Sequence, residues 1–144
     1  MLGRFNNLFS DVQRMLRTAS VIGATFSSKV LGGVLPPQLV ELMPAGLDVL
    51  LAQKWIYQDA ATGFFQFANP HVHKVIYQLT PSSERSNLHQ LIADHIEETF
   101  GEDETQYGAL SFHYQYCDTD KALRYCVKAT AVQLKTNVDR KSVV

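Results

Sequence analysis

Apolar residues recur at helical spacing along most of the chain, and this pattern predicts a mainly α-helical protein. Residues 1–9 show no such pattern, so we expect a loose lead-in there. Ser10 followed by Gln13 has the spacing of a capping box, and the apolar face that starts after it stops at Gly23. The first helix is therefore predicted between Ser10 and Gly23.

Two further helices are expected before the first cluster of aromatic residues. Ser27 is suited to cap a short helix over 28–35. Pro37 is suited to the first turn of a longer helix over 37–54, but Pro44 removes a backbone donor from the interior of that helix. We therefore predict a broken helix over 37–54 that buries most of its length.

A short β-hairpin is predicted next. Aromatic and β-branched residues gather at 55–57 and at 64–67, and the segment 59–63 between them is rich in turn-forming residues. Three helices followed by such a hairpin is the order of elements in a winged helix-turn-helix. The sequence therefore predicts a winged-helix-like module over residues 10–80.

The last part of this module and the segment after it are again predicted as helices. Asn69 is a good N-cap and Pro70 a good first helical residue, and Pro81 ends the short helix that they begin. A connecting helix is expected over 82–100. Its apolar stripe is predicted to consist of Leu88, Leu91, Ile92, Ile96 and Phe100.

A final helix pair is predicted over 104–116 and 119–136, with Asp118 as the cap of its second helix. Together, 104–136 has the size and the Ala and Tyr usage of one tetratricopeptide-like unit. A single unit leaves an apolar face uncovered, so we expect this region to self-associate weakly or to unfold. The segment 137–144 has no periodicity and is expected to be a mobile tail.

Composition and charge narrow the class of protein. The chain has 144 residues, of which 46% are hydrophobic and 19% charged, which is enough for one domain or slightly more. Its formal net charge is −1, whereas a dedicated nucleic-acid binder needs a clustered basic surplus. No apolar run reaches the ~18 residues of a membrane span, and no signal peptide is recognisable. We therefore expect a cytoplasmic protein with neither nucleic acid nor membrane as a partner.

Several short motifs follow one another in an order that resembles a known family. The first is Arg17-x-Ala19-Ser20-Val21-Ile22-Gly23-x-x-Phe26. The second runs from Phe67 to Tyr77 and continues as Arg85-x-x-Leu88-His89-x-x-Ile92-Ala93, and the third is Asp120-Lys121-Ala122-Leu123-x-Tyr125. This order resembles the winged-helix and tetratricopeptide-like region that follows the ATPase module in signal-transduction ATPases. The same layout occurs in the long non-catalytic part of the soluble adenylyl cyclases, to which residues 12–136 are similar.

The resemblance implies an accessory module rather than an enzyme. The chain contains no GxxxxGK[ST] phosphate loop, and it lacks the paired metal-binding aspartates that a class III cyclase needs. We therefore expect no catalytic, cofactor-binding or metal-binding residue, no small-molecule substrate and no binding of ATP. The implied role is that of an interdomain or protein-interaction module.

Seven residues make up the structural motif that the resemblance implies. They are Phe67, Asn69, Pro70, Tyr77, Arg85, Leu88 and His89. Asn69 departs from the family, which commonly has a His at this position, so we expect Asn69 to cap a helix rather than to sense a nucleotide. Arg85 and His89 stand four residues apart on one helix face, and we expect them to tie that helix to the hairpin.

Histidines and cysteines are the remaining candidates for chemistry. The histidines considered for a metal site are His71, His73, His89 and His95. Their spacing matches no zinc pattern, so we expect partly buried or surface histidines instead. Cys117 and Cys126 are either redox partners or small hydrophobic residues in a helix pair, and the second interpretation is favoured.

The alternative function is that of a winged-helix DNA-binding protein, whose third helix enters the major groove. The predicted helix over 37–54 carries Glu41, Asp48 and Lys54, a net charge of −1, so phosphates would be repelled. Acidic residues also gather over 94–104, where we expect a solvated helix end. The terminal Ser142-Val143-Val144 matches a PDZ ligand.

Overall fold

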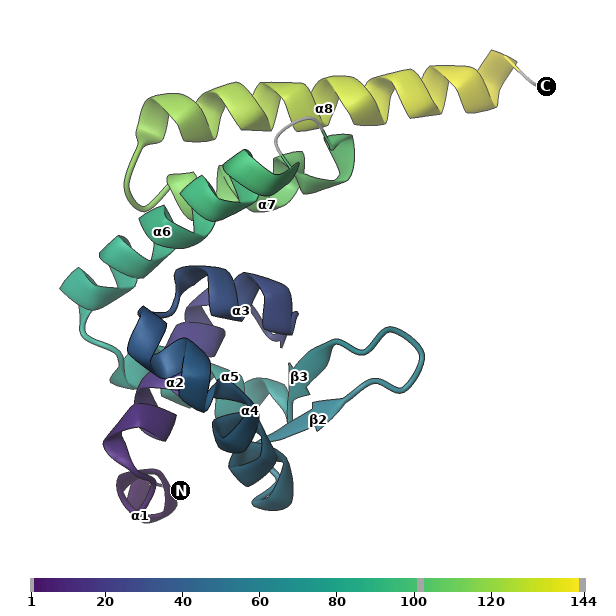
Figure 1. The fold of residues 1–144 in the computed structure, drawn as a ribbon. Coiled ribbons are helices and arrows are strands. Elements are labelled where there is room, and N and C mark those ends of the chain that lie inside the picture. The colour runs from purple at the N-terminus through teal and green to yellow at the C-terminus, as the bar shows by residue number, and fades with distance from the viewer. Residues whose placement is uncertain (1, 101–102, 143–144) are drawn as a thin grey trace. The chain divides into compact units, whose positions relative to one another are not determined.

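The computed structural model describes the backbone of residues 2–100 and 103–142, with side chains over 3–100 and 103–135 (Figure 1). The described chain is mainly helical with a small three-stranded antiparallel sheet, as predicted. It forms two compact units that divide between Leu88 and His89.

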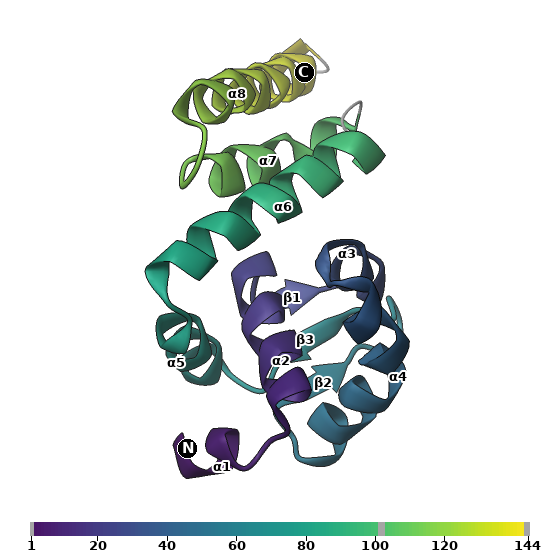
Figure 2. The same ribbon diagram turned by 60° about the vertical axis from the view of Figure 1, so that its left-hand side comes forward.

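The first unit combines helices with the sheet. Its elements are α1 (Leu2–Asn6), α2 (Ser10–Ile22), β1 (Thr25–Phe26), α3 (Ser28–Val34), α4 (Pro37–Ala52), β2 (Ile56–Gln58), β3 (Phe65–Phe67), α5 (Pro70–Leu79) and the first turns of α6 (Ser82–Phe100). The strands lie in the order β1-β3-β2, which is visible in Figure 2. Phe26 pairs with Phe65, and Ile56 pairs with Phe67 on the other side of β3. Three helices followed by a hairpin is the predicted order, and β1 adds a strand that was not predicted.

The core of the first unit lies between α2, α4 and the sheet. Among its most deeply buried side chains are those of Met15, Leu16, Leu50, Trp55 and Ile56, each at most 1% exposed. The ring of Phe26 stacks on that of Phe65, with centroids 5.7 Å apart. Strands this short make few backbone hydrogen bonds with one another. Aromatic packing on one face of the sheet therefore adds to their stability.

The expectation of a loose lead-in is wrong, because α1 is folded onto the core. Phe5 and Leu8 are buried, and the ring of Phe5 meets Trp55 edge-on. The Arg4 guanidinium lies 4.6 Å from the centre of the Trp55 ring. Two apolar residues on a five-residue helix are too few to give a periodic signal in the sequence.

The predicted capping box at Ser10 is also wrong. Ser10 is the first residue of α2, and the preceding Phe9 makes no capping hydrogen bond with its side chain. The Gln13 side-chain amide instead donates to the carbonyl oxygens of Phe5 and Leu8, 3.0 Å away in both cases. Gln13 thereby binds backbone acceptors near the end of α1, which have no partner inside that short helix.

The helix α4 is continuous, whereas a broken helix was predicted. It runs through Pro44 and ends at Ala52, two residues before Lys54, which adopts a positive φ of 62°. Leu39, Leu47 and Leu50 are buried along one side of it, while Pro44 is exposed. Packing of that apolar side against the core offsets the hydrogen bond that the proline removes.

In the residues that the structure describes, the second unit consists of three packed helices and one 3-10 turn. They are the rest of α6, η1 (Glu104–Gln106), α7 (Tyr107–Tyr114) and α8 (Thr119–Ser142). Figures 1 and 2 show α7 and α8 side by side, with α8 extending past the end of α7. Asp118 caps α8 as predicted, because its Oδ1 accepts from the N–H of Lys121 at 3.2 Å.

Two boundaries in the second unit differ from the prediction. The helix predicted over 104–116 is a 3-10 turn followed by the eight residues of α7. The α8 helix continues to Ser142, so the tail predicted over 137–144 is helical that far, and Val143-Val144 lies outside the described residues. No Gly or Pro occurs within α8 to stop it.

The buried face of α6 also differs from the predicted stripe. His89, Ile92, Ala93 and Ile96 are its buried residues in the second unit, whereas Leu91 is 50% exposed. The predicted stripe had included Leu91 and omitted His89, because a histidine was not counted as a core residue.

Candidate functional site

A tyrosine–carboxylate network joins the three helices of the second unit. We define it as Asp94, Glu97, Tyr114, Lys121 and Tyr125. The Tyr114 hydroxyl donates to Asp94 Oδ1 at 2.8 Å, and the Tyr125 hydroxyl donates to Glu97 Oε2 at 2.6 Å. Lys121 Nζ donates to the other oxygen of Glu97 at 3.2 Å. The rings of Tyr114 and Tyr125 are parallel, with centroids 6.0 Å apart.

Contacts within the network shift the pKa values of Glu97, Tyr114 and Tyr125. The hydrogen bond from Tyr125 lowers the pKa of the Glu97 carboxyl, against the opposing effect of burial. Burial and the hydrogen bond to Glu97 raise the pKa of Tyr125 to about 12. Burial, with the neighbouring Asp94, also raises the pKa of Tyr114. At neutral pH the two phenols therefore stay protonated hydrogen-bond donors, which suits a structural network rather than proton transfer.

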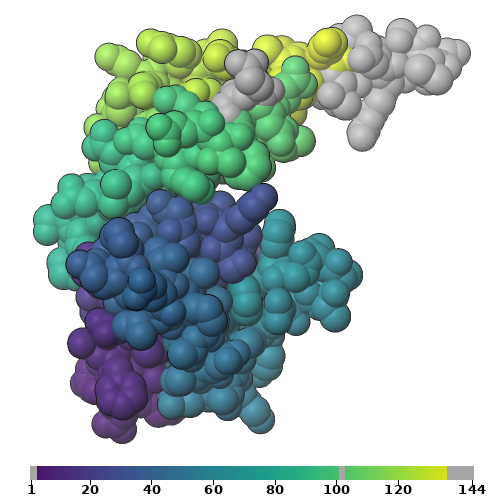
Figure 3. All heavy atoms as spheres, in the orientation of Figure 1, coloured from purple at the N-terminus to yellow at the C-terminus, as the bar shows by residue number. Residues whose placement is uncertain are grey.

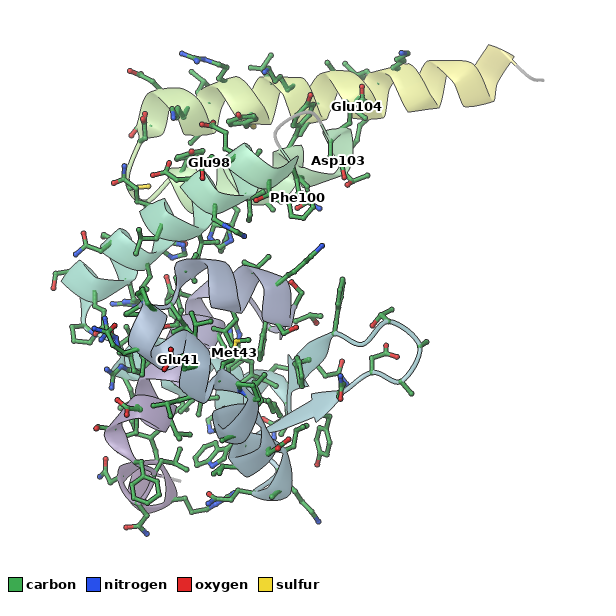
Figure 4. All side chains as sticks on the ribbon, viewed as in Figure 1. Glu41, Met43, Glu98, Phe100, Asp103 and Glu104 are labelled. Atoms are coloured by element: carbon green, nitrogen blue, oxygen red, sulfur yellow. The ribbon has the colours of Figure 1, made fainter. Side chains whose placement is uncertain are left out.

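The acidic segment 94–104 is thus only partly a solvated helix end. Asp94 and Glu97 are bonded within the helix bundle, and Asp103 Oδ1 accepts from the backbone N–H of Thr105 at 2.9 Å. Figure 4 shows Glu98, Asp103 and Glu104 around the end of α6 and the start of η1, and all three are exposed. The carboxylates of this segment therefore split between helix packing and the surface.

A histidine pair lies between α6 and α7. His89 and His113 are 1% and 3% exposed, and their Nδ1 atoms are 2.9 Å apart. One ring must donate and the other accept, so at least one of the two Nδ1 atoms carries no proton. The His89 ring also stacks on Tyr116, with centroids 4.2 Å apart. Sequence reasoning considered His89 but missed His113, because 24 residues separate them.

The motif residues of the first unit hold structural positions. Phe67 is buried, and its ring lies 5.1 Å from that of His73. Asn69 Oδ1 accepts from the N–H of Val72 at 2.9 Å, which confirms the predicted cap, and Pro70 is the first residue of α5. The Arg85 guanidinium lies 4.9 Å from the centre of the Tyr77 ring.

The structure does not bring all seven motif residues together. Arg85 contacts Tyr77 within the first unit, and Arg17 of α2 lies 3.6 Å from Glu84, the residue before it. His89, four residues after Arg85, contacts His113 in the second unit, a partner other than the predicted hairpin. Leu88 is half-buried at the end of the first unit.

A cavity of about 240 Å³ adjoins three of the motif residues. Phe67, Asn69 and Pro70 line it together with Ala24, Thr25 and Gln66. No charged side chain lines this cavity, and the Asn69 amide oxygen already accepts the capping hydrogen bond. The cavity therefore lacks the convergent polar groups that typify a ligand or catalytic site.

The other candidate metal and thiol residues are dispersed. In the described part of the chain, no three His, Cys, Asp or Glu side chains gather closely enough to hold a metal ion. His73 Nε2 donates to the Ser20 carbonyl at 2.8 Å, while His71 is exposed. Cys117 and Cys126 are both free thiols, and burial raises the pKa of the Cys117 thiol, which disfavours the reactive thiolate.

An apolar groove opens between α2 and α4 in the first unit. We define it by Phe9, Val12, Met15, Leu42, Gly46 and Val49, which enclose about 260 Å³. Phe9 is 82% exposed and Leu42 is 46% exposed. A Cβ at Gly46 would lie 2.4 Å from Met15 Sδ, so this glycine lets the Met15 side chain pack directly against α4. The groove is smaller than the ~300–1,000 Å³ of small-molecule pockets and fits protein side chains better.

An apolar stripe runs along the free face of α8. We define the α8 stripe as Leu123, Val127 and Leu134, which are 65%, 61% and 60% exposed. Ala122 and Tyr125, on the other side of the helix, are buried. Figure 3 shows α8 up to Lys135 at the molecular surface. Large apolar side chains on one exposed face of a helix are typical of a contact surface.

The helix α4 gives no support to the DNA-binding alternative. Within Pro37–Ala52 the charged residues are Glu41 and Asp48, without Lys or Arg, so the two carboxylates give a net charge of −2. Figure 4 places Glu41 on this helix. The phosphate backbone of DNA would be repelled by it.

No family model matches this chain, and no curated protein or solved structure is similar enough to it to count as a match. Among the helices that the structure describes, none is both long and apolar enough to cross a membrane.

Proposed function

We propose that this chain is a non-catalytic protein-interaction module and that the α8 stripe is its contact surface. The observation that carries the proposal is the exposure of Leu123, Val127 and Leu134, each at least 60%. Their spacing of four and seven residues places them along one face of α8. In stacked helical repeats such a face is buried by the next helix, so here it is free to bind another protein.

The resemblance to the non-catalytic region of the soluble adenylyl cyclases supports the same role. What supports the proposal is the order of elements: three helices (α2, α3 and α4) precede the hairpin, and the helices α7 and α8 come later in the chain. The polar groups that do converge, in the tyrosine–carboxylate network, hydrogen-bond to one another within the bundle. These contacts favour an accessory module over an enzyme.

Sedimentation of the full chain tests the proposal. We expect the average mass of the wild-type chain to rise above the 16.2 kDa of the monomer as its concentration increases. Val127→Glu places a charge in the α8 stripe and should weaken the association about tenfold or more. Gln133→Glu adds the same charge at an exposed position of α8 outside the stripe and serves as the control.

Two results would overturn the proposal. One is a wild-type chain that stays monomeric at every concentration. The other is an equal effect of Val127→Glu and Gln133→Glu, which would assign the association to net charge rather than to the stripe. Circular dichroism of both variants checks that the helix content is unchanged.

A further inference from the structure

We infer that the α8 stripe of one copy docks into the apolar groove of a second copy, so that the chain associates head to tail. This inference rests on the proposed function and names the partner of the α8 stripe.

The two surfaces match in apolar spacing. Leu42 and Val49 line the groove seven residues apart on α4, and Val127 and Leu134 lie seven residues apart on α8. Both pairs therefore span about 10 Å along their helices at ~1.5 Å per residue. An amphipathic helix that lays a row of apolar side chains into a groove is a recurrent mode of recognition.

The two surfaces also match in charge. On α4 the acidic residues Glu41 and Asp48 directly precede Leu42 and Val49, and both are exposed. On α8 a basic residue directly follows each member of the stripe: Arg124, Lys128 and Lys135, all exposed. Asp11 adds a third carboxylate at the groove. An acidic row beside the groove thus faces a basic row beside the stripe, which selects this pairing over two grooves or two stripes.

The order of charges sets the direction of docking. In a pair of parallel helices, a residue that directly follows a contact residue on one helix lies beside a residue that directly precedes a contact residue on the other helix. The e and g positions of parallel coiled coils meet in this way. The row Arg124, Lys128, Lys135 then lies beside Glu41 and Asp48. The α8 helix of one copy is therefore inferred to run parallel to α4 of the next.

Head-to-tail contacts have a consequence for the assembly. Each copy offers one groove and one stripe, so the interface is heterologous and does not end at a symmetric dimer. The mass of the wild-type chain is expected to keep rising past twice the monomer mass. The association should also weaken as salt is added, because the charged rows are exposed and screened.

The test combines two variants that each lose one surface. Leu42→Glu places a charge in the groove, and Val127→Glu places one in the stripe; both residues are exposed, so folding is retained. Each variant alone should stay monomeric. An equal mixture of the two restores one intact pairing, and it should form a heterodimer of about twice 16.2 kDa in sedimentation. Val40→Glu, on α4 but outside the groove lining, is the control and should associate as the wild-type chain does.

Each outcome decides between the two proposals. A heterodimer in the mixture, with monomers in the separate samples, supports the inference. If Leu42→Glu and Val40→Glu associate alike while Val127→Glu does not, the stripe binds elsewhere: the inference is overturned and the proposed function stands. If Val127→Glu also associates like the wild-type chain, both fail. Association of the two variants separately to the same extent as their mixture overturns the head-to-tail pairing.

Discussion

Glu97 is the residue on which the polar interior of the second unit converges. It accepts hydrogen bonds from Tyr125 and Lys121, both on α8, while it stands on α6 itself. Hydrogen bonds to a charged acceptor are worth roughly 1.5–3 kcal/mol when partly shielded from water. Since Glu97 is about one-third exposed, its contribution belongs at or below the lower end of that range.

The stability of the second unit should fall at both ends of the pH scale. The pKa of Glu97 is lower in the folded chain, so its contribution is complete above about pH 4.5 and is lost as the pH falls through the folded value. The pKa of Tyr125 is raised to about 12 from an ordinary value of 10.0, so its contribution is complete below pH 10 and is lost as the pH rises toward 12. Urea unfolding followed by circular dichroism at acidic, neutral and alkaline pH measures both limbs.

Matched variants assign these limbs to the two residues. Glu97→Gln should remove most of the acidic limb and cost about 1 kcal/mol at neutral pH. Tyr125→Phe should make the loss of stability at alkaline pH smaller, and the part that remains belongs to Tyr114, whose pKa is also raised. Glu98→Gln changes an exposed carboxylate one position away and should leave both limbs as in the wild-type chain. An acidic limb unchanged in Glu97→Gln would contradict the role given to this carboxyl.

Residue roles that depend on neighbours in the sequence could be predicted, and those that depend on distant residues could not. Asn69 and Asp118 each cap a helix by accepting a hydrogen bond from the backbone N–H three residues later, and both caps were predicted. The bond between Tyr125 and Glu97 spans 28 residues, and the one between His89 and His113 spans 24. No periodicity or local motif reports such a pairing, so the network and the histidine pair emerge only from the fold.

At the scale of elements, strong start signals were the reliable part of the sequence. Helices α3 and α5 begin where Ser27 and Asn69-Pro70 predicted them, and α6 begins at Ser82, as predicted for the connecting helix over 82–100. The two-residue strand β1 and the five-residue helix α1 were missed, because segments this short carry no measurable period. The continuity of α4 was missed because tertiary packing overrides the proline signal.

The cap at the start of α5 should have a measurable share in the stability of the first unit. Asn69→Ala removes the acceptor for the Val72 N–H and should lower the free energy of unfolding by about 1 kcal/mol. Asn69→Asp keeps the acceptor and should lie within a few tenths of the wild-type value. The fluorescence of the single tryptophan, Trp55, measures both in urea, since its ring is buried in the same unit. Equal stability of the Ala and Asp variants would contradict the capping role.

At the scale of the whole molecule, the two units differ in how their interiors are built. The first unit has a contiguous aliphatic and aromatic core around Trp55. The second depends more on polar contacts and leaves the α8 stripe exposed. Local stability follows buried apolar contacts, so the second unit is expected to open first.

Limited proteolysis with trypsin, at concentrations where the chain is monomeric, should therefore begin on α8. Cleavage is expected first after Arg124, Lys128 and Lys135, while Lys29 and Lys54 of the first unit stay uncut for longer. Mass spectrometry of the early fragments identifies the sites. Equal resistance of the two units through residue 136 would contradict this order, and so would an early cut at Lys54, which is exposed and provides an internal control for access.

The tip of the hairpin between β2 and β3 holds its shape without the core. Asp59 Oδ1 accepts from the Ala61 N–H at 2.8 Å, the Gly63 N–H donates to the Asp59 carbonyl at 2.7 Å, and Thr62 Oγ1 accepts from Phe64. Every residue from Asp59 to Phe64 is exposed. Chain inserted between Ala60 and Thr62 would replace only these local bonds, and loop closure grows slowly with length. The tip is thus a place to attach an epitope or a fluorophore while the groove and the α8 stripe keep their own side chains.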